Sequence, residues 1–459
     1  MSNLVQPREA FANRARAALG DAHLQGALDL GTRRLYEGRR RAWESLPATE
    51  QLREAAHRIR SRTIGDLDTY AARFADAVEA RGGQVAFCRT GEEACEYIAE
   101  VCRRAGAQLA VKSKSMASEE IGLNAALAAS GVRAIETDLG EYLLQLAGAH
   151  PAHIIAPAIE LTKEDIARLL SRVEGEPVEP ELTALTAAAR RQLRVAFQQA
   201  DVGITGANFG VAETGSICLV TNEGNGRLVS ALPRVHVALM GVERLVPTTA
   251  ELAVLLELLA RSGTGQTLST YTTLLTGPRR DGEADGPDEL HVVLLDNGRS
   301  KLLRGRYREM LNCIRCGACL NVCPVYRKSG GGAYGPVYSG PMGAVLVPLL
   351  VGLENAPSLP HASSLCGACT AACPVKIPLH ELLLDLRRDL VGQHVTSLRE
   401  RLAFTLWSFA WSRPATYRLS TLLARIGKPF ARLAGPGRAW AAGRELPPLA
   451  RRRYRDRRS

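Results

Sequence analysis

The chain has 459 residues, of which 46% are hydrophobic and 23% are charged. That balance is typical of a soluble globular protein, and the length suggests two or three domains of roughly 100–200 residues each. The formal net charge is +11, but residues 391–459 contain fifteen Arg and Lys against three Asp and Glu, so the rest of the chain sums to −1. The basic charge is therefore a property of the C-terminal tail, and we expect no nucleic-acid partner.

The N-terminus and the cysteines indicate the compartment. The first twenty residues are polar and charged, unlike a signal peptide, and no apolar run reaches the roughly 18–20 residues that span a bilayer. Eleven cysteines in such a chain indicate metal or redox chemistry in a reducing compartment rather than disulfides. We therefore expect a cytoplasmic protein.

In chain order, a helical segment comes first and a mixed segment follows. Residues 1–80 are charged, rich in alanine and periodic, which predicts helices. Between residues 81 and 298, short apolar runs alternate with helical stretches, which predicts an α/β domain with a largely parallel sheet. The expected strands cover residues 84–88, 107–112, 132–138, 153–158, 215–221, 236–242 and 290–297.

Residues 299–392 hold seven of the cysteines between helix-like flanks at 300–311 and 378–392. Because 42 residues separate Cys323 from Cys366, we expect an all-helical ferredoxin domain with an inserted loop rather than a compact ferredoxin with short hairpins. Residues 393–459 form a basic tail that contains three tryptophans, Trp407, Trp411 and Trp440. A helix is expected at 398–411 of that tail.

Two cysteine motifs predict the chemistry of residues 299–392. The first is Cys313-x2-Cys316-x2-Cys319-x3-Cys323-Pro324, and the second is Cys366-x2-Cys369-x3-Cys373-Pro374. In two-cluster ferredoxins the last cysteine of each run ligates the other cluster. By that logic one [4Fe–4S] cluster is held by Cys313, Cys316, Cys319 and Cys373, and the other by Cys323, Cys366 and Cys369.

The count of thiolates leaves one ligand position open. Two cubanes ligated only by cysteine need about eight thiolates, and Ser363 stands where the missing first cysteine of the second motif would be. An oxygen ligand, completion by another residue or a partner, and a three-iron centre all fit the sequence. Zinc is the main rival, because paired C-x2-C motifs also form tetrahedral thiolate sites, but one closed zinc site would leave three cysteines over.

The α/β segment contains a glycine-dense stretch, residues 201–226. It resembles a phosphate-cradling region, but its spacing matches neither a P-loop nor a dinucleotide fingerprint, and tight βα turns are the plainer interpretation. Glu213 in this stretch is either a catalytic carboxylate or a turn residue. The scattered thiols Cys95, Cys102 and Cys218 are expected to be buried, and Cys88 has no evident partner.

Charged and hydroxyl side chains follow two predicted strands of the same segment. Lys112 and Lys114 are candidate anion ligands, and Ser115 or Ser118 is expected to cap a helix. The carboxylates that follow residues 132–138 stand where α/β proteins keep their sites, although helix caps show the same pattern. These carboxylates are Glu136, Asp138 and Glu141. No residue is assigned as catalytic on this basis.

Together these segments resemble a known family. KSKSMASEEIGLN (112–124), ETDLGEY (136–142), ITGANFGVAETGSI (204–217) and both cysteine motifs with their flanks are similar to lactate utilization protein B, the iron–sulfur subunit of a three-part bacterial L-lactate oxidation system. The resemblance covers about residues 10–400. It implies a lactate-utilisation domain related in fold to ribose-phosphate isomerases and CoA transferases, two [4Fe–4S] clusters grouped as above, and seven cysteines as the family pattern.

The resemblance also implies partners and a role. The expected partners are a subunit with cysteine-rich repeats and a second subunit built on the same α/β domain. The arginines and aromatics of the tail suit docking to a subunit, with peripheral contact at the inner face of a membrane as the alternative. We expect an electron-transfer subunit of a complex that oxidises lactate to pyruvate, rather than a complete enzyme. The alternatives are an autonomous α/β enzyme, or a scaffold, with structural clusters.

Overall fold

The computed structural model describes residues 4–5, 10–151, 153–335 and 337–427. The chain forms two compact units, Met1–Leu390 and Val391–Ser459, and each is treated separately below. Trp440 and the terminal run of arginines at residues 451–458, both noted in the sequence, lie outside the described residues.

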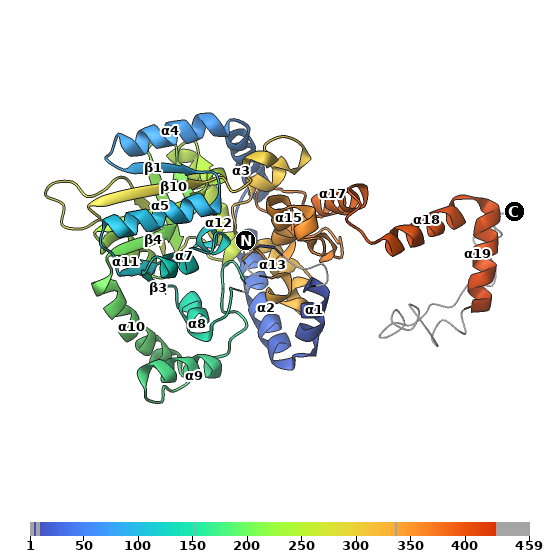
Figure 1. Cartoon of the computed structure of the whole chain (residues 1–459), viewed down its shortest axis with the longest axis horizontal. Helices are drawn as coiled ribbons and strands as arrows, with labels where there is room; N and C mark the ends of the chain where they lie inside the picture. Colours follow the sequence, from blue (N-terminus) through green and yellow to red (C-terminus); the bar gives the residue numbers. More distant parts are fainter. Residues whose placement is uncertain (1–3, 6–9, 152, 336, 428–459) are drawn as a thin grey trace. The chain divides into compact units, whose positions relative to one another are not determined.

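The expected N-terminal helices are present (Figure 1). They are α1 (Ala10–Gly20), α2 (Ala22–Glu44), α3 (Thr49–Gly65) and α4 (Leu67–Glu79). Asp21 begins α2 because its carboxylate accepts a hydrogen bond from the amide of Leu24 at 3.0 Å, which satisfies one of the unpaired amides of the first turn. Helix α3 buries the guanidinium of Arg60 together with apolar neighbours, and this arginine reappears at the site described below.

A six-stranded parallel sheet forms the centre of the α/β part. Its strands lie in the order β1-β10-β7-β4-β2-β3, and every neighbouring pair is parallel. Helices cover both faces, so the central strands are mostly apolar, and all seven residues of β7 are buried. The strands are β1 (Gln84–Cys88), β2 (Leu109–Lys112), β3 (Arg133–Glu136), β4 (Val202–Gly206), β7 (Val235–Gly241) and β10 (Glu289–Leu295).

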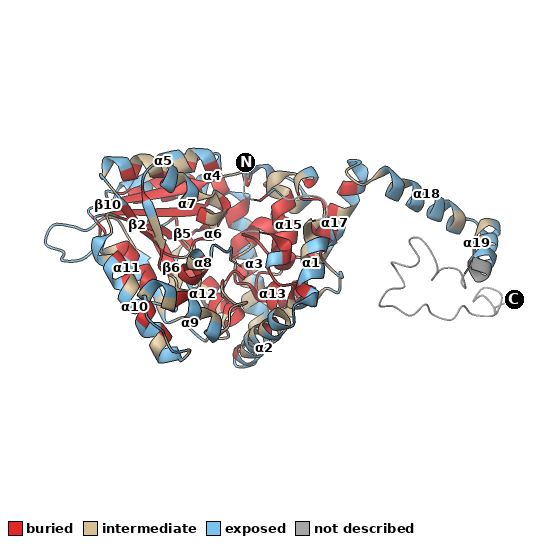
Figure 2. Cartoon of the chain, turned by 60° about the horizontal axis from the view of Figure 1, so that its bottom comes forward, coloured by how far each residue is buried: buried red, intermediate tan, exposed pale blue. Residues whose placement is uncertain are grey.

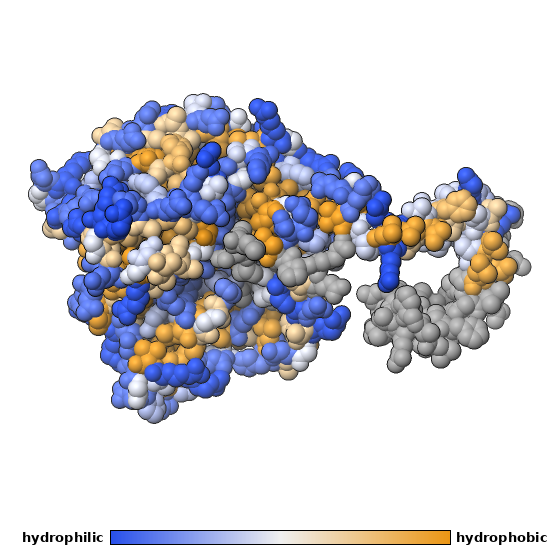
Figure 3. Space-filling model, in the orientation of Figure 1, coloured by the Kyte–Doolittle hydropathy of each residue, from blue (hydrophilic) through white to orange (hydrophobic). Residues whose placement is uncertain are grey.

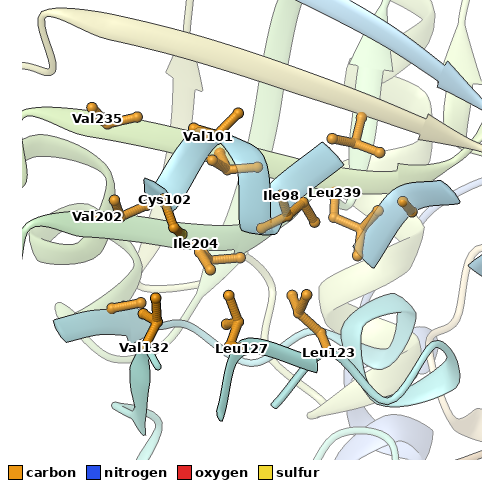
Figure 4. Packing of buried hydrophobic residues seen from close by; sticks show 14 of the residues in the cluster. Ile98, Val101, Cys102, Leu123, Leu127, Val132, Val202, Ile204, Val235 and Leu239 are labelled. Atoms are coloured by element: carbon orange, nitrogen blue, oxygen red, sulfur yellow. The ribbon is translucent and has the colours of Figure 1, made fainter. Parts of the chain in front are cut away.

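Helices α5 (Gly91–Arg104) and α7 (Leu123–Ala129) pack on one face of this sheet. Figure 4 shows side chains of these helices, including Ile98 and Leu127, meeting Ile204 and Leu239 of the strands. Phe74 and Val78 of α4 pack on the other face. The remaining helices of this part are α6 (Met116–Glu120), α8 (Leu139–Ala147), α9 (Lys163–Glu174), α10 (Leu182–Gln199), α11 (Asn225–Ala231) and α12 (Thr249–Gly263).

A second, four-stranded sheet corrects the interpretation of the glycine-dense stretch. Its order is β8-β5-β6-β9, with β6 antiparallel to both neighbours. The glycines therefore lie mainly in β-strands and ββ turns, whereas Gly224, at the start of α11, belongs to a βα turn. The turn between β5 and β6 contains Gly215 at φ 66°, a backbone conformation that favours glycine. The strands are β5 (Phe209–Val211), β6 (Ser216–Thr221), β8 (Leu245–Val246) and β9 (Tyr271–Leu275).

The expected strand at residues 153–158 is wrong, because this segment consists of bends and turns. The Nδ1 atom of His153 accepts hydrogen bonds from the amides of Ile155 and Ala156 at 3.0 and 3.1 Å, which closes a local turn. Pro157 removes a further amide donor. The expected strand at 215–221 exists as β6, but in the second sheet.

The cysteine-bearing segment is largely helical, as expected, and none of its described residues forms a strand. The helix expected at 300–311 is instead two 3-10 segments, η2 (Ser300–Leu302) and η3 (Arg306–Asn312), separated by Gly305 at φ 96°. The α-helices are α13 (Ala318–Val322), α14 (Tyr326–Ser329), α15 (Gly340–Val351), α16 (Ala368–Ala372) and α17 (Leu379–Gly392). Further 3-10 segments are η1 (Val242–Arg244), η4 (Gly332–Tyr334), η5 (Leu353–Asn355) and η6 (Leu359–His361).

The second unit contains α18 (Leu398–Ser412) and α19 (Pro414–Gly427), which pack against each other. Trp411 stacks on Trp407 and meets the edge of Tyr417, with ring centres 5.5 and 5.4 Å apart. No residue of α18 is buried, as Figure 2 shows, and the apolar surface of this helix is visible in Figure 3. Within the part of the chain that the structure describes, no helix combines the length and apolar character needed to cross a bilayer.

Candidate iron–sulfur site

The two cysteine motifs share one backbone conformation. Arg315 and Leu365, which precede the second cysteine position of each motif, have φ of 58° and 57°. Gly317 and Gly367, which follow it, have φ of 75° and 80° and begin the short helices α13 and α16. Such positive φ values are costly for arginine and leucine, so the surrounding structure enforces this loop shape twice. Helices α13 and α16 pack on each other, which brings the two loops together.

The first predicted ligand set gathers around one small cavity. Cys313, Cys316, Cys319 and Cys373 all line it, among apolar side chains such as Ile154 and Met342. Burial raises the pKa of Cys316 and of Cys373 to about 12, and each is raised further by a neighbouring cysteine of this set. Thiolates packed this closely repel one another, so they need a bound metal centre as a counter-charge.

The second predicted set lies next to the first. Burial, followed by the proximity of Cys323 and Cys366, raises the pKa of Cys369 to about 11. Cys319 of the first set is influenced by Cys369 as well, which places the two groups side by side. Cys366 is exposed, whereas Cys323 and Cys369 are buried. The second set is therefore closer to solvent than the first.

Ser363 occupies the position in the second loop that Cys313 occupies in the first. The amide of Arg315 donates a hydrogen bond to the Cys313 Sγ atom at 3.4 Å. The amide of Leu365 donates the corresponding hydrogen bond to the Ser363 Oγ atom at 3.1 Å. The missing eighth thiolate is thus replaced by a hydroxyl in an equivalent backbone setting.

Buried arginines hold the first loop in place. Arg60 donates hydrogen bonds to the carbonyls of Leu245 at 2.7 Å, Leu311 at 3.0 Å and Asn312 at 3.3 Å, and also to the carbonyl of Glu243. Arg244 donates to the Cys313 carbonyl at 2.8 Å. These cations place positive charge where a [4Fe–4S] cluster with its thiolates would carry negative charge. The donor set and its surroundings fit an iron–sulfur cluster.

A cavity of about 480 Å³ lies beside the first loop. It opens at the ends of the neighbouring strands β2 and β4. The strand order changes direction here, because β3, the next strand in the sequence, lies on one side of β2, and β4, the strand after that, lies on its other side. Ligands of open α/β sheets bind at such a point. Lys114 and Asp138 line the cavity, and Arg315 and Ile154 line both this cavity and the one around the first cysteine set.

An ion-pair network joins the cavity wall to the first loop. Arg299 pairs with Glu120 at 2.8 Å and with Glu243 at 2.7 Å, and the Glu243 carboxylate also accepts a hydrogen bond from Arg315 at 3.2 Å. Arg299, Glu120 and Glu243 are almost completely buried, and Arg315 is partly buried. Despite its burial, the pKa of Glu243 is lowered to about 2 by Arg299 and Arg315. The network fixes the loop of Cys313 to the α/β part.

Three family models match the chain: the LUD domain at residues 71–295, the 4Fe-4S dicluster domain at 309–377, and the C-terminal domain of lactate utilisation protein B at 387–459. Lactate utilization protein B of Shouchella clausii (strain KSM-K16) is 48% identical over 454 residues, which cover 97% of this chain and 96% of that protein. The chain belongs to the lactate utilization protein B family. The protein of the same name from Bacillus thuringiensis (strain Al Hakam) is 45% identical over the same shares.

A crystal structure of a DUF162 family protein from Deinococcus radiodurans covers 50% of this chain and 98% of that chain, at 16% identity and a TM-score of 0.25, which is too low to support an argument. The family match confirms the predicted lactate-utilisation and iron–sulfur domains. The grouping of individual cysteines into ligand sets stays a prediction.

The candidate residues of the LUD domain have different positions relative to the cavity. Lys112 pairs with Glu136 at 2.6 Å behind the cavity and is fully buried. Ser115 caps α6, as the sequence predicted, by accepting from the Ser118 amide. Glu213 accepts from the Thr249 amide at 3.0 Å at the start of α12, which agrees with a turn or cap role, and it does not line the cavity.

Sequence reasoning missed several residues that line the cavity. Glu223 lies in the loop after β6, and its pKa is raised to about 7 by loss of hydration and by the nearby Asp138 carboxylate. Arg244, Arg299 and Tyr338 reach the wall from three separate segments. The glycine density near Glu223 was the only signal in the sequence, and it does not identify this side chain.

Proposed function

We propose that this chain is an iron–sulfur electron-transfer component in lactate utilisation. Cys313, Cys316, Cys319 and Cys373 hold one [4Fe–4S] cluster, and Cys323, Cys366 and Cys369 hold the other. The observation that carries this proposal is that seven thiols lie in two adjoining groups, each of which contains cysteines from both motifs. Bound clusters supply one-electron acceptor sites, and the protein contributes their close spacing and the apolar shielding of the first one.

The relatives are named for lactate utilisation, and we propose that the electrons come from the oxidation of lactate to pyruvate. That reaction releases two electrons and two protons, so two one-electron centres in one chain match the number of electrons. The protein works in the cytoplasm on this proposal, which its eleven free cysteines support.

The proposed partners are a subunit with cysteine-rich repeats and a second subunit with a LUD domain. Helix α18 offers a docking element, because Leu402, Phe404, Trp407 and Trp411 are more than half exposed, with Leu402 on one side of the helix and the three aromatic residues on the opposite side. A helix with apolar side chains on opposite sides favours enclosure by protein, whereas a membrane-surface helix is apolar on one face only. Subunit docking is therefore favoured over peripheral membrane contact.

We also keep the proposed domain boundaries, with a helical segment at 1–80, the α/β domain at 81–298, the ferredoxin-type domain at 299–392 and the tail at 393–459. The proposed relation of the α/β domain to ribose-phosphate isomerases and CoA transferases is supported by its parallel sheet with helices on both faces.

A second candidate function is an autonomous enzyme, or a scaffold, in which the α/β part acts and the clusters are structural. The 480 Å³ cavity in the LUD domain favours this alternative. EPR of the anaerobic holoprotein, mixed with lactate and the two partner subunits, separates the candidates. Reduction of both clusters supports electron transfer, and clusters that stay oxidised while lactate is consumed contradict it.

A further inference from the structure

Among the described residues that line the cavity at the ends of β2 and β4, one cation has no direct partner. Within the described part of the chain, no hydrogen bond or ion pair reaches the Lys114 ammonium, and Asp138, Glu141 and Glu223 influence it only from a longer distance. The arginines of the same wall are engaged: Arg299 and Arg315 pair with carboxylates, and Arg244 donates to backbone carbonyls. A partly buried cation of this kind needs a counter-ion.

Of the three carboxylates that influence Lys114, Asp138 and Glu223 already have other partners. The third, Glu141, is buried, and burial raises its pKa well above the ordinary value, so it favours the neutral form. Asp138 accepts a hydrogen bond from the Glu141 amide at 3.3 Å as the cap of α8, and Glu223 accepts one from the Leu139 amide at 3.3 Å. Beside these polar groups the wall is apolar, with Met116, Leu219 and Leu239. A mixed wall of this kind fits a ligand with one anionic end and a short apolar body.

We propose that this cavity binds a small organic acid as its carboxylate, with the Lys114 ammonium as the counter-ion. The inference rests on the proposed function only in taking L-lactate and pyruvate as probes. Because Arg315 and Ile154 line both the cavity and the space around the first cysteine set, the bound acid lies next to the first cluster. Sites at a strand-order switch are where open α/β sheets bind ligands, and this cavity has that position.

The test is calorimetric titration of the oxidised holoprotein with sodium L-lactate, sodium pyruvate and inorganic phosphate. We expect binding of at least one carboxylate, at least tenfold weaker binding in Lys114→Met, and unchanged binding in Lys301→Met, a lysine that is exposed and does not line the cavity. Asp138→Asn keeps the helix cap but removes a negative charge, so it should tighten binding, which a purely structural role of Lys114 would not explain.

The pH dependence adds a second readout. Glu223 faces Asp138 and Lys114, and its pKa of about 7 means that it becomes negative as the pH rises through neutrality. Anion affinity should therefore fall between pH 6 and pH 8. The proposal is overturned if phosphate binds but neither acid does, or if none of the three anions binds. It is also overturned if neither Lys114→Met nor Asp138→Asn changes the affinity for the acid. None of these outcomes depends on electron transfer, so a failure here is distinct from a failure of the clusters to reduce.

An independent observation concerns the second cluster. The Leu365 amide donates to Ser363 Oγ as the Arg315 amide donates to Cys313 Sγ, and the two loops share their φ values. Arg387 fixes this loop by donating to the carbonyls of Pro360 at 2.8 Å and Ser363 at 2.7 Å. We propose that the Ser363 oxygen is the fourth ligand of the second cluster. Its proton passes to solvent, which the exposure of Cys366 allows.

Mössbauer and EPR spectra of the ⁵⁷Fe-loaded holoprotein test this ligand. In the wild type we expect one iron site distinct from the thiolate-ligated sites. Ser363→Ala should lose about one iron atom per chain on mild oxidation and give the EPR signal of a three-iron centre. Ser363→Cys should keep a four-iron cluster without the distinct site. A Ser363→Ala spectrum identical to that of the wild type overturns the proposal.

Discussion

Arg60 offers the sharpest test of how the first cysteine loop is held. Its side chain is completely buried, and it donates to four backbone carbonyls, two of which belong to Leu311 and Asn312 just before Cys313. A buried acceptor that loses its donor costs about 1–3 kcal/mol, so Arg60→Met should destabilise this region by roughly 4 kcal/mol even at the low end. That energy corresponds to roughly a thousandfold larger population of the opened loop.

The assay is the rate of iron release to a chelator under anaerobic conditions. Because three of the four thiols of the first set are buried, we expect release of iron to require opening of the loop, so Arg60→Met should release iron about a hundredfold to a thousandfold faster than the wild type. Arg58→Met is the matched control, since Arg58 lies on the same helix but is exposed. Release from Arg60→Met within threefold of the control would refute the reasoning.

Three further predictions follow. Cys373→Ala should roughly halve the iron content from about eight atoms per chain, whereas Cys218→Ala, which removes a buried thiol of β6, should leave it unchanged in the same colorimetric assay. Burial and the nearby Glu136 carboxylate raise the pKa of Glu141, so folding forces this group to stay protonated and costs stability increasingly as the pH rises above 4.5. Glu141→Gln should therefore raise the melting temperature at pH 8 more than at pH 5, and equal shifts at both values would contradict this. Trp407→Ala should leave iron content and the melting temperature unchanged but weaken co-purification of partner subunits, and intact co-purification would speak against docking through α18.

The parts of the fold that the sequence predicted well are those decided by local pattern. β7 and β10 are apolar along nearly their whole length, as strands covered on both faces must be, and both appear within two residues of their expected positions. The closeness of cysteines within one motif also follows from local spacing, because C-x2-C loops bring neighbouring thiols together, whereas the grouping into two ligand sets across the motifs stays a prediction.

The parts that sequence reasoning missed depend on long-range packing. β5 has three residues and β8 two, too few for a recognisable pattern. β5 is a strand because it pairs with β6 and β8, and β8 is a strand because it pairs with β5. The approach of Glu223 to Lys114 likewise depends on the strand order, which no local pattern encodes. Residues 153–158 looked like a strand because of their apolar residues, yet the turn made by His153 determines their structure.

The central claim is that seven cysteines of this chain hold two [4Fe–4S] clusters, and one measurement tests it most directly. Iron and acid-labile sulfide are quantified in the anaerobically purified full chain, together with EPR of the dithionite-reduced protein. We expect about eight iron atoms and eight sulfides per chain, with the EPR spectrum of two interacting [4Fe–4S]⁺ centres. About four iron atoms with a single-cluster spectrum, or zinc without sulfide, would contradict it.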